Sequence, residues 1–373
     1  MQVFWDPQVF TWQEHGGISR VFAELYREFA GNDYGVEVVL PPFHGRSAFA
    51  ADAGLPQKPV WSIPGRRNRR RLKRWLNRAS FARALRRRPP QLIHPTFYEA
   101  DFLRLVPDIP FVLTVHDMIH ERFASSWLAA ATATAFRNKK RMLIERATRF
   151  IATSESTRQD MIELMSIEPD RIDVIWHGTS LSVSQPDEPV HESSGGRPYL
   201  LFAGHRTVYK NFMAFLRAVA PMLSARDLDL LCIGGGPLTS EELNLASSLG
   251  VASRVAQKTL SDQELGMAYK QAEMFVFPSL FEGFGLPLLE AMACSCAVVA
   301  SDIAPFREVA ADAAAYFDPE DEASMAAAIE RVLDDAALRS KLVAAGSERC
   351  KVFTWQRSAE QTAATYRRAI ESA

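Results

Sequence analysis

Short apolar runs alternate with helix-like segments along the chain, and this alternation limits the possible fold more than any other feature. The runs that favour strands are Val36–Leu40, Gln91–His94, Phe111–His116, Arg149–Thr153, Ile172–Ile175, Tyr199–Ala203, Leu228–Gly234, Phe275–Pro278 and Ala297–Ser301. Helical patterns lie between them, at Ser19–Ala30, Arg69–Arg87, Ala129–Ala147, Ser156–Met165, Asn211–Leu223, Ser261–Gln271, Pro287–Cys294 and Ala323–Leu333. Strands that alternate with helical crossovers form parallel sheets, so the sequence predicts an α/β fold.

The 373 residues are enough for two domains. Residues 183–198 are rich in Pro, Ser, Gly and acidic residues, a composition typical of a linker. We therefore expect two doubly wound domains, at residues 1–185 and 186–352, and a terminal segment at 353–373 that contains the amphipathic helix Trp355–Glu371. Ligands bind at the carboxyl ends of the strands in such sheets, so a cleft between the two domains is the expected site.

Composition excludes several other classes of protein. The chain contains no run of about 20 apolar residues that could span a membrane. Its first residues, MQVFWDPQVF, lack the charged segment and apolar run of a signal peptide. The four cysteines have neither disulfide-framework nor zinc-site spacing, which favours small buried thiols in a reducing compartment. We expect a cytoplasmic protein.

A basic stretch at residues 66–88 interrupts an otherwise acidic chain. It holds twelve Arg or Lys residues and no acid, so the remainder carries −1 − 12 = −13 charges. Leu72, Trp75, Leu76, Ala79, Ala82 and Leu85 recur in it at helical spacing. A basic amphipathic helix with a Trp is typical of a membrane-surface element, and the proposed patch comprises Arg66, Arg67, Arg70, Arg71, Arg74 and Trp75. Nucleic acid is the competing partner, and a solvated helix packed on its own domain is the plain alternative.

Two glutamates flank a Gly-rich turn in the run FEGFGLPLLEAMA. Glu282 should lie on a loop after the strand that contains Phe275, and Glu290 about one turn into the following helix, where Pro287 suits the first helical position. The helix N-terminus favours an anion. Two carboxylates beside an anion site fit a ligand with both hydroxyls and phosphate, such as a nucleotide sugar. The plain alternative is a buried strand, a turn and an ordinary helix start.

Cationic side chains follow the first strand of the second half. Arg206 and Lys210 come after Gly204 and precede a helix, and both suit a diphosphate. A solvated surface would explain them equally simply, but the carboxyl end of a strand is where ligands bind. The next strand ends in a glycine run that contains Gly235, which either admits a ligand to the backbone or makes a sharp turn.

The first half offers two further candidates. Gly16 and Gly17 precede a helix and can form a phosphate-accepting loop or a plain turn. His116 ends an apolar strand beside Asp117, where it can bind a hydroxyl or simply support the fold. Asp227 and Asp229 have the spacing of a metal-binding acid pair, but they precede a strand and so lie at the wrong end of the sheet. We therefore predict no metal site and no cofactor.

Together these motifs resemble the family-4 group of retaining glycosyltransferases with the GT-B fold. The resemblance covers nearly the whole chain, and its strongest part is the EX7E motif from Glu282 to Glu290. GHRTVYKNF at 204–212 is similar to the diphosphate motif of the family, HGGISR at 15–20 to its N-terminal Gly-Gly loop, and TVHD at 114–117 to its acceptor-side histidine segment. The chain departs from the family at Ser295, which replaces a helix-ending glycine, and at Trp176-His177, which replaces Pro-Asn.

The resemblance implies a fold of two Rossmann-like domains across a cleft and a role for each motif. Glu282 would contact the donor sugar, Glu290 the ribose, and Arg206 and Lys210 the leaving diphosphate, while His116 would lie near the acceptor. The remaining donor contacts would come from Gly16, Gly17, Gly204, Gly235, Gly283, Phe284 and Gly285. The terminal helix would cross back to the first domain.

The sequence therefore predicts a retaining, metal-independent glycosyltransferase. It would move a sugar from a nucleotide diphosphate, with GDP-mannose or a related GDP-sugar favoured, to a glycan or lipid-linked glycan in surface polysaccharide synthesis. We expect it on the inner face of the cell membrane, with no nucleic-acid partner. A UDP-sugar transferase, a GT-B nucleotide-sugar epimerase and a non-enzymatic basic module that binds lipid or nucleic acid are the alternatives.

Overall fold

The computed structural model describes residues 1–58, 66–123, 130–181 and 196–373, with the backbone alone at residues 66–70, 130–133 and 135. The chain divides into two compact units: unit 1 comprises Met1–His177 and Trp355–Ala373, and unit 2 comprises Gly178–Thr354. The sequence places the boundaries after residues 185 and 352, whereas the structure divides the chain after His177 and Thr354. Most of the predicted linker lies outside the described residues.

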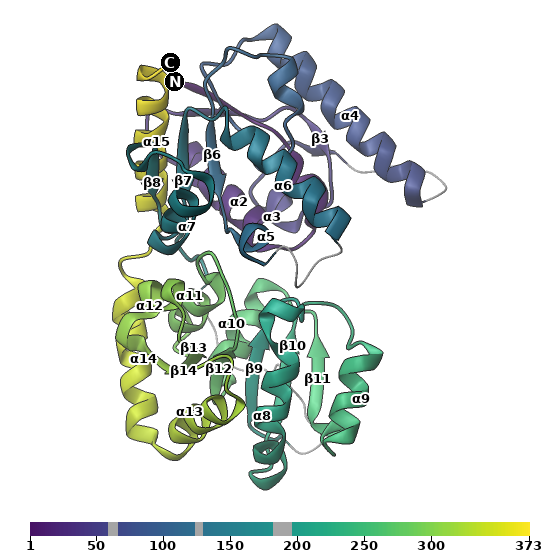
Figure 1. Cartoon of the computed structure of the whole chain (residues 1–373), viewed down its shortest axis with the longest axis vertical. Coiled ribbons are helices and arrows are strands. Elements are labelled where there is room, and N and C mark those ends of the chain that lie inside the picture. The colour runs from purple at the N-terminus through teal and green to yellow at the C-terminus, as the bar shows by residue number, and fades with distance from the viewer. Residues whose placement is uncertain (59–65, 124–129, 182–195) are drawn as a thin grey trace. The chain divides into compact units, whose positions relative to one another are not determined.

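Unit 1 is built around parallel strands (Figure 1). One sheet has the order β2-β1-β5 and another the order β6-β7-β8, and a parallel bridge between Ile93 and Phe111 joins them. A separate pair, β3-β4, is also parallel. The strands are β1 (Gln2–Trp5), β2 (Glu37–Val39), β3 (Phe43–His44), β4 (Gln57–Lys58), β5 (Leu92–His94), β6 (Val112–Val115), β7 (Arg149–Ala152) and β8 (Ile172–Val174). The helices are α1 (Gln8–Trp12), α2 (Gly17–Gly31), α3 (Ala48–Asp52), α4 (Arg66–Arg87), α5 (Ile119–Arg122), α6 (Ala130–Ile144), α7 (Glu155–Met165) and α15 (Trp355–Glu371).

Unit 2 contains one six-stranded sheet in the order β11-β10-β9-β12-β13-β14, and all its neighbours are parallel. Its strands are β9 (Tyr199–Ala203), β10 (Asp229–Ile233), β11 (Val255–Lys258), β12 (Met274–Phe277), β13 (Val298–Ser301) and β14 (Ala314–Phe317). Its helices are α8 (Phe212–Ala225), α9 (Ser240–Ser248), α10 (Asp262–Gln271), α11 (Leu286–Ala293), α12 (Ala304–Ala310), α13 (Glu322–Asp334) and α14 (Ala336–Cys350). The order reverses between β9 and β12, so a crevice is expected at the carboxyl ends of these two strands.

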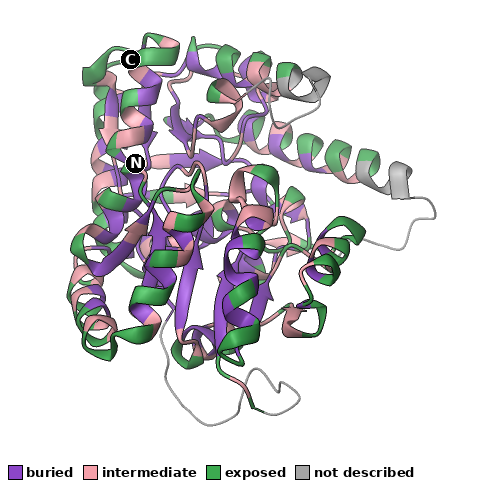
Figure 2. Cartoon of the chain, turned by 60° about the horizontal axis from the view of Figure 1, so that its bottom comes forward, coloured by how far each residue is buried: buried purple, intermediate pink, exposed green. Residues whose placement is uncertain are grey.

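Burial explains why the central strands read as continuous apolar runs. Every residue of β9, β10, β12 and β13 is buried, because helices cover both faces of a parallel sheet (Figure 2). Phe202 on β9 packs against Phe212 and Phe215 of α8, with ring centroids 5.2 and 6.1 Å apart. The edge strand β11 is only partly buried along its length.

The terminal helix α15 belongs to unit 1 and closes its core. The Tyr366 hydroxyl lies 2.6 Å from His94 Nδ1 on β5 and accepts a hydrogen bond of 3.3 Å from Trp5 Nε1 on β1. Both Trp5 and Tyr366 are fully buried. The helix therefore contributes core side chains to unit 1, although its sequence follows all of unit 2.

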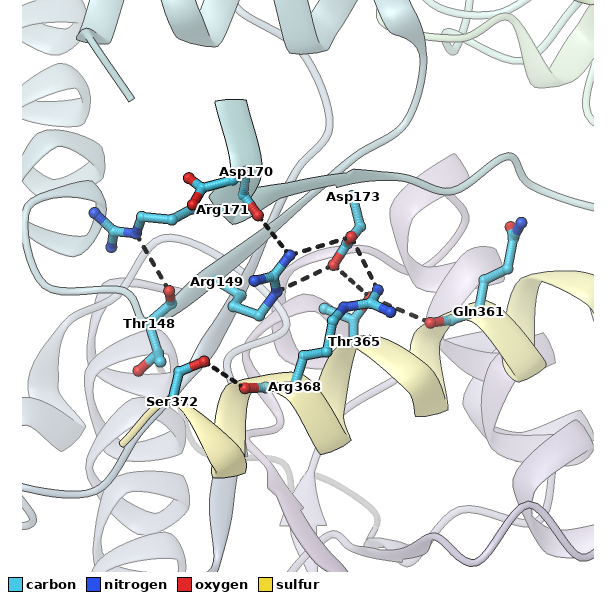
Figure 3. Close-up of polar contacts among 9 residues, drawn as sticks. All are labelled: Thr148, Arg149, Asp170, Arg171, Asp173, Gln361, Thr365, Arg368 and Ser372. Atoms are coloured by element: carbon cyan, nitrogen blue, oxygen red, sulfur yellow. Dashed lines mark hydrogen bonds and ion pairs between the residues drawn. The ribbon is translucent and has the colours of Figure 1, made fainter. Parts of the chain in front are cut away.

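A cluster of charged side chains fixes the other side of α15 to the sheet (Figure 3). Asp173 on β8 accepts hydrogen bonds from Thr365 (2.9 Å) and from Arg149 on β7 (3.3 Å), and it pairs with Arg368 at 2.9 Å. Burial alone would raise the pKa of Asp173, but the bonds from Arg149, Arg368 and Thr365 outweigh it and lower that pKa. Asp173 thus stays ionised and links α15 to β7 and β8.

Ser295 lies just beyond the end of helix α11 and has the left-handed conformation that the sequence anticipates there. Its φ is +58°, its N–H donates to the Met292 carbonyl (3.1 Å), and the Cys296 N–H donates to Ala291 (2.9 Å). These are the two hydrogen bonds of a Schellman motif, in which glycine is the common left-handed residue. A side chain in this conformation costs about 1 kcal/mol.

Ser295→Gly is therefore expected to stabilise unit 2 by about 1 kcal/mol, measured from the urea midpoint. Ser347→Gly is the matched control, because Ser347 is exposed in the interior of α14 and glycine disfavours helix. It should destabilise unit 2 by roughly 0.5 kcal/mol. Equal effects of the two substitutions would contradict the strain at Ser295.

Two features of the composition have structural counterparts. No helix among the described residues is long and apolar enough to cross a membrane. All four cysteines are free, and Cys232, Cys294 and Cys296 are buried. Burial raises the pKa of Cys232 to about 12, so this thiol stays protonated and unreactive at neutral pH.

Candidate active site

The predicted donor residues of unit 2 lie at the carboxyl edge of its sheet. The loop after β9 carries Gly204 and Lys210, and the loop after β12 carries Glu282. The two loops are joined through the backbone, since the Leu280 N–H donates to the Tyr209 carbonyl at 2.8 Å. Because β9 and β12 flank the point where the strand order reverses, these loops lie at the switch point, where a doubly wound sheet is expected to bind its ligand.

Lys210 and Glu282 form the central ion pair of this edge. Lys210 Nζ donates to Glu282 Oε1, and the Ser279 hydroxyl donates to the same oxygen at 2.8 Å. The side chains of Lys210 and Glu282 are only 12% and 15% exposed, so water screens their charges weakly. Lys210 Nζ also lies 5.0 Å from the ring centroid of Phe277, at the end of β12. The Lys210–Glu282 pair is thus shielded from water and is contacted by Ser279 and Phe277.

Glu290 has different surroundings. It lies in α11, is 8% exposed, and its Oε2 is 3.5 Å from the Tyr269 hydroxyl of α10. Helix α11 begins after Gly285, with Pro287 in its first turn, close to where the sequence predicts it. The φ of Gly285 is +105°, and a Cβ there would lie 3.0 Å from the Phe306 ring, so only glycine fits. Gly283 and Phe284 are buried in the same turn.

Arg206 lies in a second network, separate from Lys210 and Glu282. Its Nε donates to Glu242 Oε1 at 2.9 Å, and both side chains are nearly fully buried. Its Nη1 donates to the Gly234 carbonyl at 2.9 Å, and its Nη2 to those of Gly236 (2.7 Å) and Pro237 (2.9 Å). In this structure the guanidinium group supports the glycine loop after β10, and its predicted contact with a diphosphate stays a prediction.

Gly235 and Gly204 allow the two loops to approach each other. The φ of Gly235 is +71°, and a Cβ there would lie 2.9 Å from the Gly204 carbonyl oxygen and 2.8 Å from Arg206 Nη1. The φ of Gly204 is +126°, which also favours glycine. The two loops can therefore approach each other this closely because glycine occupies both positions. On the amino side of β10, Asp227 pairs with Arg197 and Arg254, both at 2.9 Å.

The candidates of unit 1 lie at the carboxyl side of its own strands. Gly16 precedes α2 and Gly17 begins it, while the Gln13 side chain accepts the Ser19 N–H at 3.1 Å in the first turn. His116 follows β6, and its ring is 6.2 Å from that of Phe22 on α2 and 6.5 Å from that of His177. The structure thus brings the Gly-Gly helix and His116 to one region of unit 1.

Three histidines of unit 1 stay neutral in the fold. Burial lowers the pKa of His94 and of His177 to about 3 each. Burial also lowers the pKa of His116 well below its usual range, and the positive charge of Lys140 adds to this effect. A neutral His116 can accept or donate a hydrogen bond but carries no charge toward a substrate.

Unit 1 should lose stability steeply in acid. A histidine with a lowered folded pKa contributes stability that is fully present above its unfolded pKa of about 6.5 and is lost as pH falls toward the folded value. Asp6 opposes this, because burial raises its pKa from 3.8 to about 7. Below pH 6, unfolding of unit 1 therefore takes up roughly three protons at the histidines and releases one from Asp6. The net uptake is about two protons. We expect a loss of about 3 kcal/mol per pH unit.

Urea unfolding of unit 1 at pH 7, 6 and 5 checks this expectation. His94→Gln, which keeps polar groups beside Tyr366 and Thr114, removes one of the three histidine protons and should reduce the slope by about one half. An unchanged midpoint between pH 7 and pH 5 would show that the histidines protonate in the folded protein.

The basic helix α4 combines two environments. Trp75 is 63% exposed and Leu72 37%, whereas Phe81 and Leu85 are buried. The apolar stripe predicted from Leu72 to Leu85 is thus divided, because its C-terminal part packs on unit 1 and its N-terminal part meets solvent. Figure 1 shows α4 extending beyond the other elements of unit 1. Of the predicted patch, Arg71, Arg74 and Trp75 are exposed, and the side chains of Arg66, Arg67 and Arg70 lie outside the described part.

Sequence reasoning missed three residues of the unit 2 site. Ser279 holds Glu282, Tyr269 contacts Glu290, and Glu242 pairs with Arg206. Ser279 is the second residue after the β12 strand and carries the same signal as the other strand-end residues. Glu242 forms a capping box with Thr239 at the start of α9, a spacing visible in the sequence. Tyr269 occupies an apolar position of helix α10, and nothing else in the sequence indicates its contact with Glu290.

The two units, each built on parallel strands with helical crossovers, have the architecture of the GT-B fold, and solved structures agree with this fold. Sucrose-phosphate synthase from Thermosynechococcus elongatus matches with a TM-score of 0.76, 20% identity and 100% of both chains covered. Anabaena HepE in complex with UDP and glucose matches with a TM-score of 0.74, 17% identity and 98% of both chains covered.

The sequence comparisons then give the family. Residues 15–183 match the model described as Glycosyltransferase Family 4, and residues 184–349 match that of Glycosyl transferases group 1. Alpha-maltose-1-phosphate synthase of Mycolicibacterium smegmatis is 31% identical over 292 residues, which cover 71% of this chain and 74% of that protein. The chain belongs to glycosyltransferase family 4 and is a glycosyltransferase.

Proposed function

We propose that the protein transfers a sugar, with retention of its anomeric configuration and without a metal ion, from a nucleotide diphosphate to a hydroxyl of a glycan or lipid-linked glycan. The observation that carries this proposal is the sheltered Lys210–Glu282 pair at the switch point between β9 and β12. A cation and a carboxylate meet there at the place where a doubly wound sheet binds nucleotides.

The chemistry assigned to the site is mainly stabilisation of the leaving group. The bond between the anomeric carbon and the diphosphate oxygen breaks, and negative charge grows on the diphosphate, where a preorganised cation such as Lys210 acts most strongly. The acceptor oxygen attacks from the face that the leaving group departs, and its proton passes to the departing phosphate. Glu282 contacts hydroxyls of the donor sugar, and Glu290 contacts the ribose.

Glu282 is assigned as a donor ligand rather than as a nucleophile. Its Oε1 already accepts hydrogen bonds from Lys210 and Ser279, which reduce its nucleophilicity. A double-displacement mechanism needs two carboxyl groups that flank the bond about 5 Å apart. Glu282 contacts Lys210 and Ser279, and Glu290 contacts the Tyr269 hydroxyl, so we assign the two carboxylates separate ligand groups.

A GDP-sugar, mannose first, is the donor that the GGISR and YKNF segments favour. UDP-glucose is the competing donor, because the HepE structure of the same fold holds UDP and glucose. Thermal unfolding with GDP, UDP, GDP-mannose and UDP-glucose distinguishes the two. At 100 times its Kd, a bound ligand adds about 2.7 kcal/mol, which shifts the melting point of a unit of this size by roughly 5 to 10 °C.

Product analysis completes the test. Transfer from the bound donor should continue in the presence of a chelator, and the new bond should have the anomeric configuration of the donor. A change of donor stereochemistry without any acceptor would identify an epimerase instead. If none of the four nucleotides shifts the melting point, the proposed function is wrong.

The exposed part of α4 supports a second proposal, contact with an anionic membrane surface on the cytoplasmic side during surface polysaccharide synthesis. Trp75 and Leu72 are exposed apolar side chains among arginines, the composition of an interfacial helix. Each cation near an anionic surface contributes about 1 kcal/mol. Arg71→Gln with Arg74→Gln should therefore weaken binding to vesicles with one third phosphatidylserine roughly 30-fold.

Salt should weaken the vesicle binding as well, since the attraction is screened. Vesicles of phosphatidylcholine alone are the control. Equal binding of wild type and the double variant to anionic vesicles would remove α4 from the membrane contact.

A further inference from the structure

The chain leaves the sheet of unit 1 after β6, and side chains hold the segment that follows, which begins at His116. The His116 N–H donates to the Tyr98 hydroxyl at 3.2 Å, and the His116 carbonyl accepts a hydrogen bond from the Thr153 hydroxyl at 3.1 Å. Tyr98 follows β5 and Thr153 follows β7, so both neighbouring strands contribute a contact. The main-chain position of His116 therefore depends on side chains from other elements.

Lys140 on α6 makes a third contact with this segment. Its Nζ donates to the Asp117 carbonyl at 2.6 Å and lies 5.3 Å from the ring centroid of Tyr98. The Lys140 side chain is only 1% exposed. A lysine is almost never buried so completely without a partner of opposite charge, because removing an ammonium group from water costs free energy.

Glu121 on α5 is the partner of Lys140. Its Oε2 lies 3.0 Å from Lys140 Nζ, and its side chain is 6% exposed. Its Oε1 is buried and has no hydrogen-bond partner among the residues that the structure describes. Such an ion pair stabilises a fold poorly, because two apolar side chains of similar size often do as well or better. Stability alone therefore does not account for the Lys140–Glu121 pair.

The geometry of Lys140 gives the pair another task. Its ammonium group contacts the main chain directly after His116, the carboxylate of Glu121 in the next helix, and Met118 Sδ at 3.2 Å. An ammonium group has three donors, so it can bind the Asp117 carbonyl and the carboxylate at once. Lys140 thus fixes the direction of the Asp117 carbonyl and, with it, the peptide that carries His116.

We propose that Lys140, paired with Glu121, is a positioning residue for sugar transfer, which fixes the main chain after β6 and so holds His116 in place beside the acceptor. The inference rests on the proposed function and on the acceptor-side place that the family resemblance gives His116. Both side chains of the pair are buried, so they act through the main chain rather than on the substrate. Misplacement of a reacting group by about 1 Å can lower a rate about 100-fold.

The double variant Lys140→Met with Glu121→Met tests this inference on the full chain. The two methionines leave no unpaired charge, so the urea midpoint of unit 1 should stay close to the wild-type value. The Asp117 carbonyl loses its donor, and kcat for sugar transfer should therefore fall about 10- to 100-fold. The Kd for the nucleotide sugar should not change, because Lys210 and Glu282 belong to unit 2.

Arg141→Met is the matched control. Arg141 is the next residue of α6 and pairs with Glu145 at 3.0 Å, but it is 73% exposed. Removing this surface ion pair should leave kcat unchanged.

A double-mutant cycle with His116→Gln separates positioning from a general loss of structure. If Lys140 acts through His116, the methionine pair should lower kcat no more than about threefold in the His116→Gln chain, because residues that act as a unit have non-additive effects. Equal losses in the two backgrounds overturn the proposal. Wild-type kcat in the methionine variant overturns it as well.

Hydrogen exchange at residues 116–119 gives a readout that does not depend on transfer. The N–H groups of His116 and Ile119 donate to the Tyr98 hydroxyl and to Asp117 Oδ1. Their protection should fall about tenfold in the methionine variant and stay unchanged in Arg141→Met. Unchanged protection in the methionine variant would show that the pair does not fix the segment. A wild-type chain without nucleotide-sugar affinity would refute the proposed function, whatever the exchange shows.

Discussion

Lys210→Ala is expected to lower kcat/KM for sugar transfer about 100- to 1,000-fold, the loss that follows when one preorganised partner of a developing negative charge is removed. In the structure Lys210 is sheltered from water and fixed by Glu282, so its charge is already in place before the diphosphate leaves. The fall should appear mainly in kcat, because the charge on the leaving group grows in the transition state.

Arg217→Ala is the matched control for this experiment. Arg217 belongs to α8 of the same unit and pairs with Glu322 at 2.7 Å, but both side chains are 43% exposed. Removing such a surface ion pair costs at most about 1 kcal/mol and should leave kcat/KM unchanged. Normal transfer by Lys210→Ala would mean that the leaving group is stabilised elsewhere.

Arg206→Met is expected to destabilise unit 2 by about 3 to 5 kcal/mol. The substitution leaves the carboxylate of Glu242 buried without its partner and removes the donors to three carbonyls of the glycine loop. The double variant Arg206→Met with Glu242→Met should recover much of the loss, since no unpaired charge then remains. Urea unfolding of unit 2 measures both changes.

The same two variants decide between two roles for Arg206. If Arg206→Met keeps the wild-type unfolding midpoint but loses nucleotide-sugar affinity, the guanidinium group serves the diphosphate, as the sequence motif predicts. If it unfolds at lower urea while the double variant binds the nucleotide normally, Arg206 holds the loop. The buried position of its side chain favours the second result.

The sequence predicts most of the alternating strands and helices, although it misses the short buried strand β1. Tyr199–Ala203 and Trp355–Glu371 are predicted with their observed bounds, because an all-buried strand and a long amphipathic helix have strong patterns. Strand β11 (Val255–Lys258) escapes prediction, since an edge strand that is only partly buried alternates too weakly. Helix α9, Ser240–Ser248, is also missed, although its capping box marks its start.

The site is predicted in part, for a physical reason that the two cations illustrate. Position after a strand identifies both Arg206 and Lys210, because parallel strands bring their carboxyl ends to one edge. Position does not reveal side-chain direction, and the structure turns Arg206 into the glycine loop and Lys210 toward Glu282.

Unit 1 consists of two segments that the whole of unit 2 separates in sequence. A ribosome that synthesises this chain therefore delivers α15 only after the complete sequence of unit 2 has emerged. Until then Trp5 and His94 lack Tyr366, their buried hydrogen-bonding partner. The later-encoded unit is free to finish folding first, which reverses the usual order in which domains mature during translation.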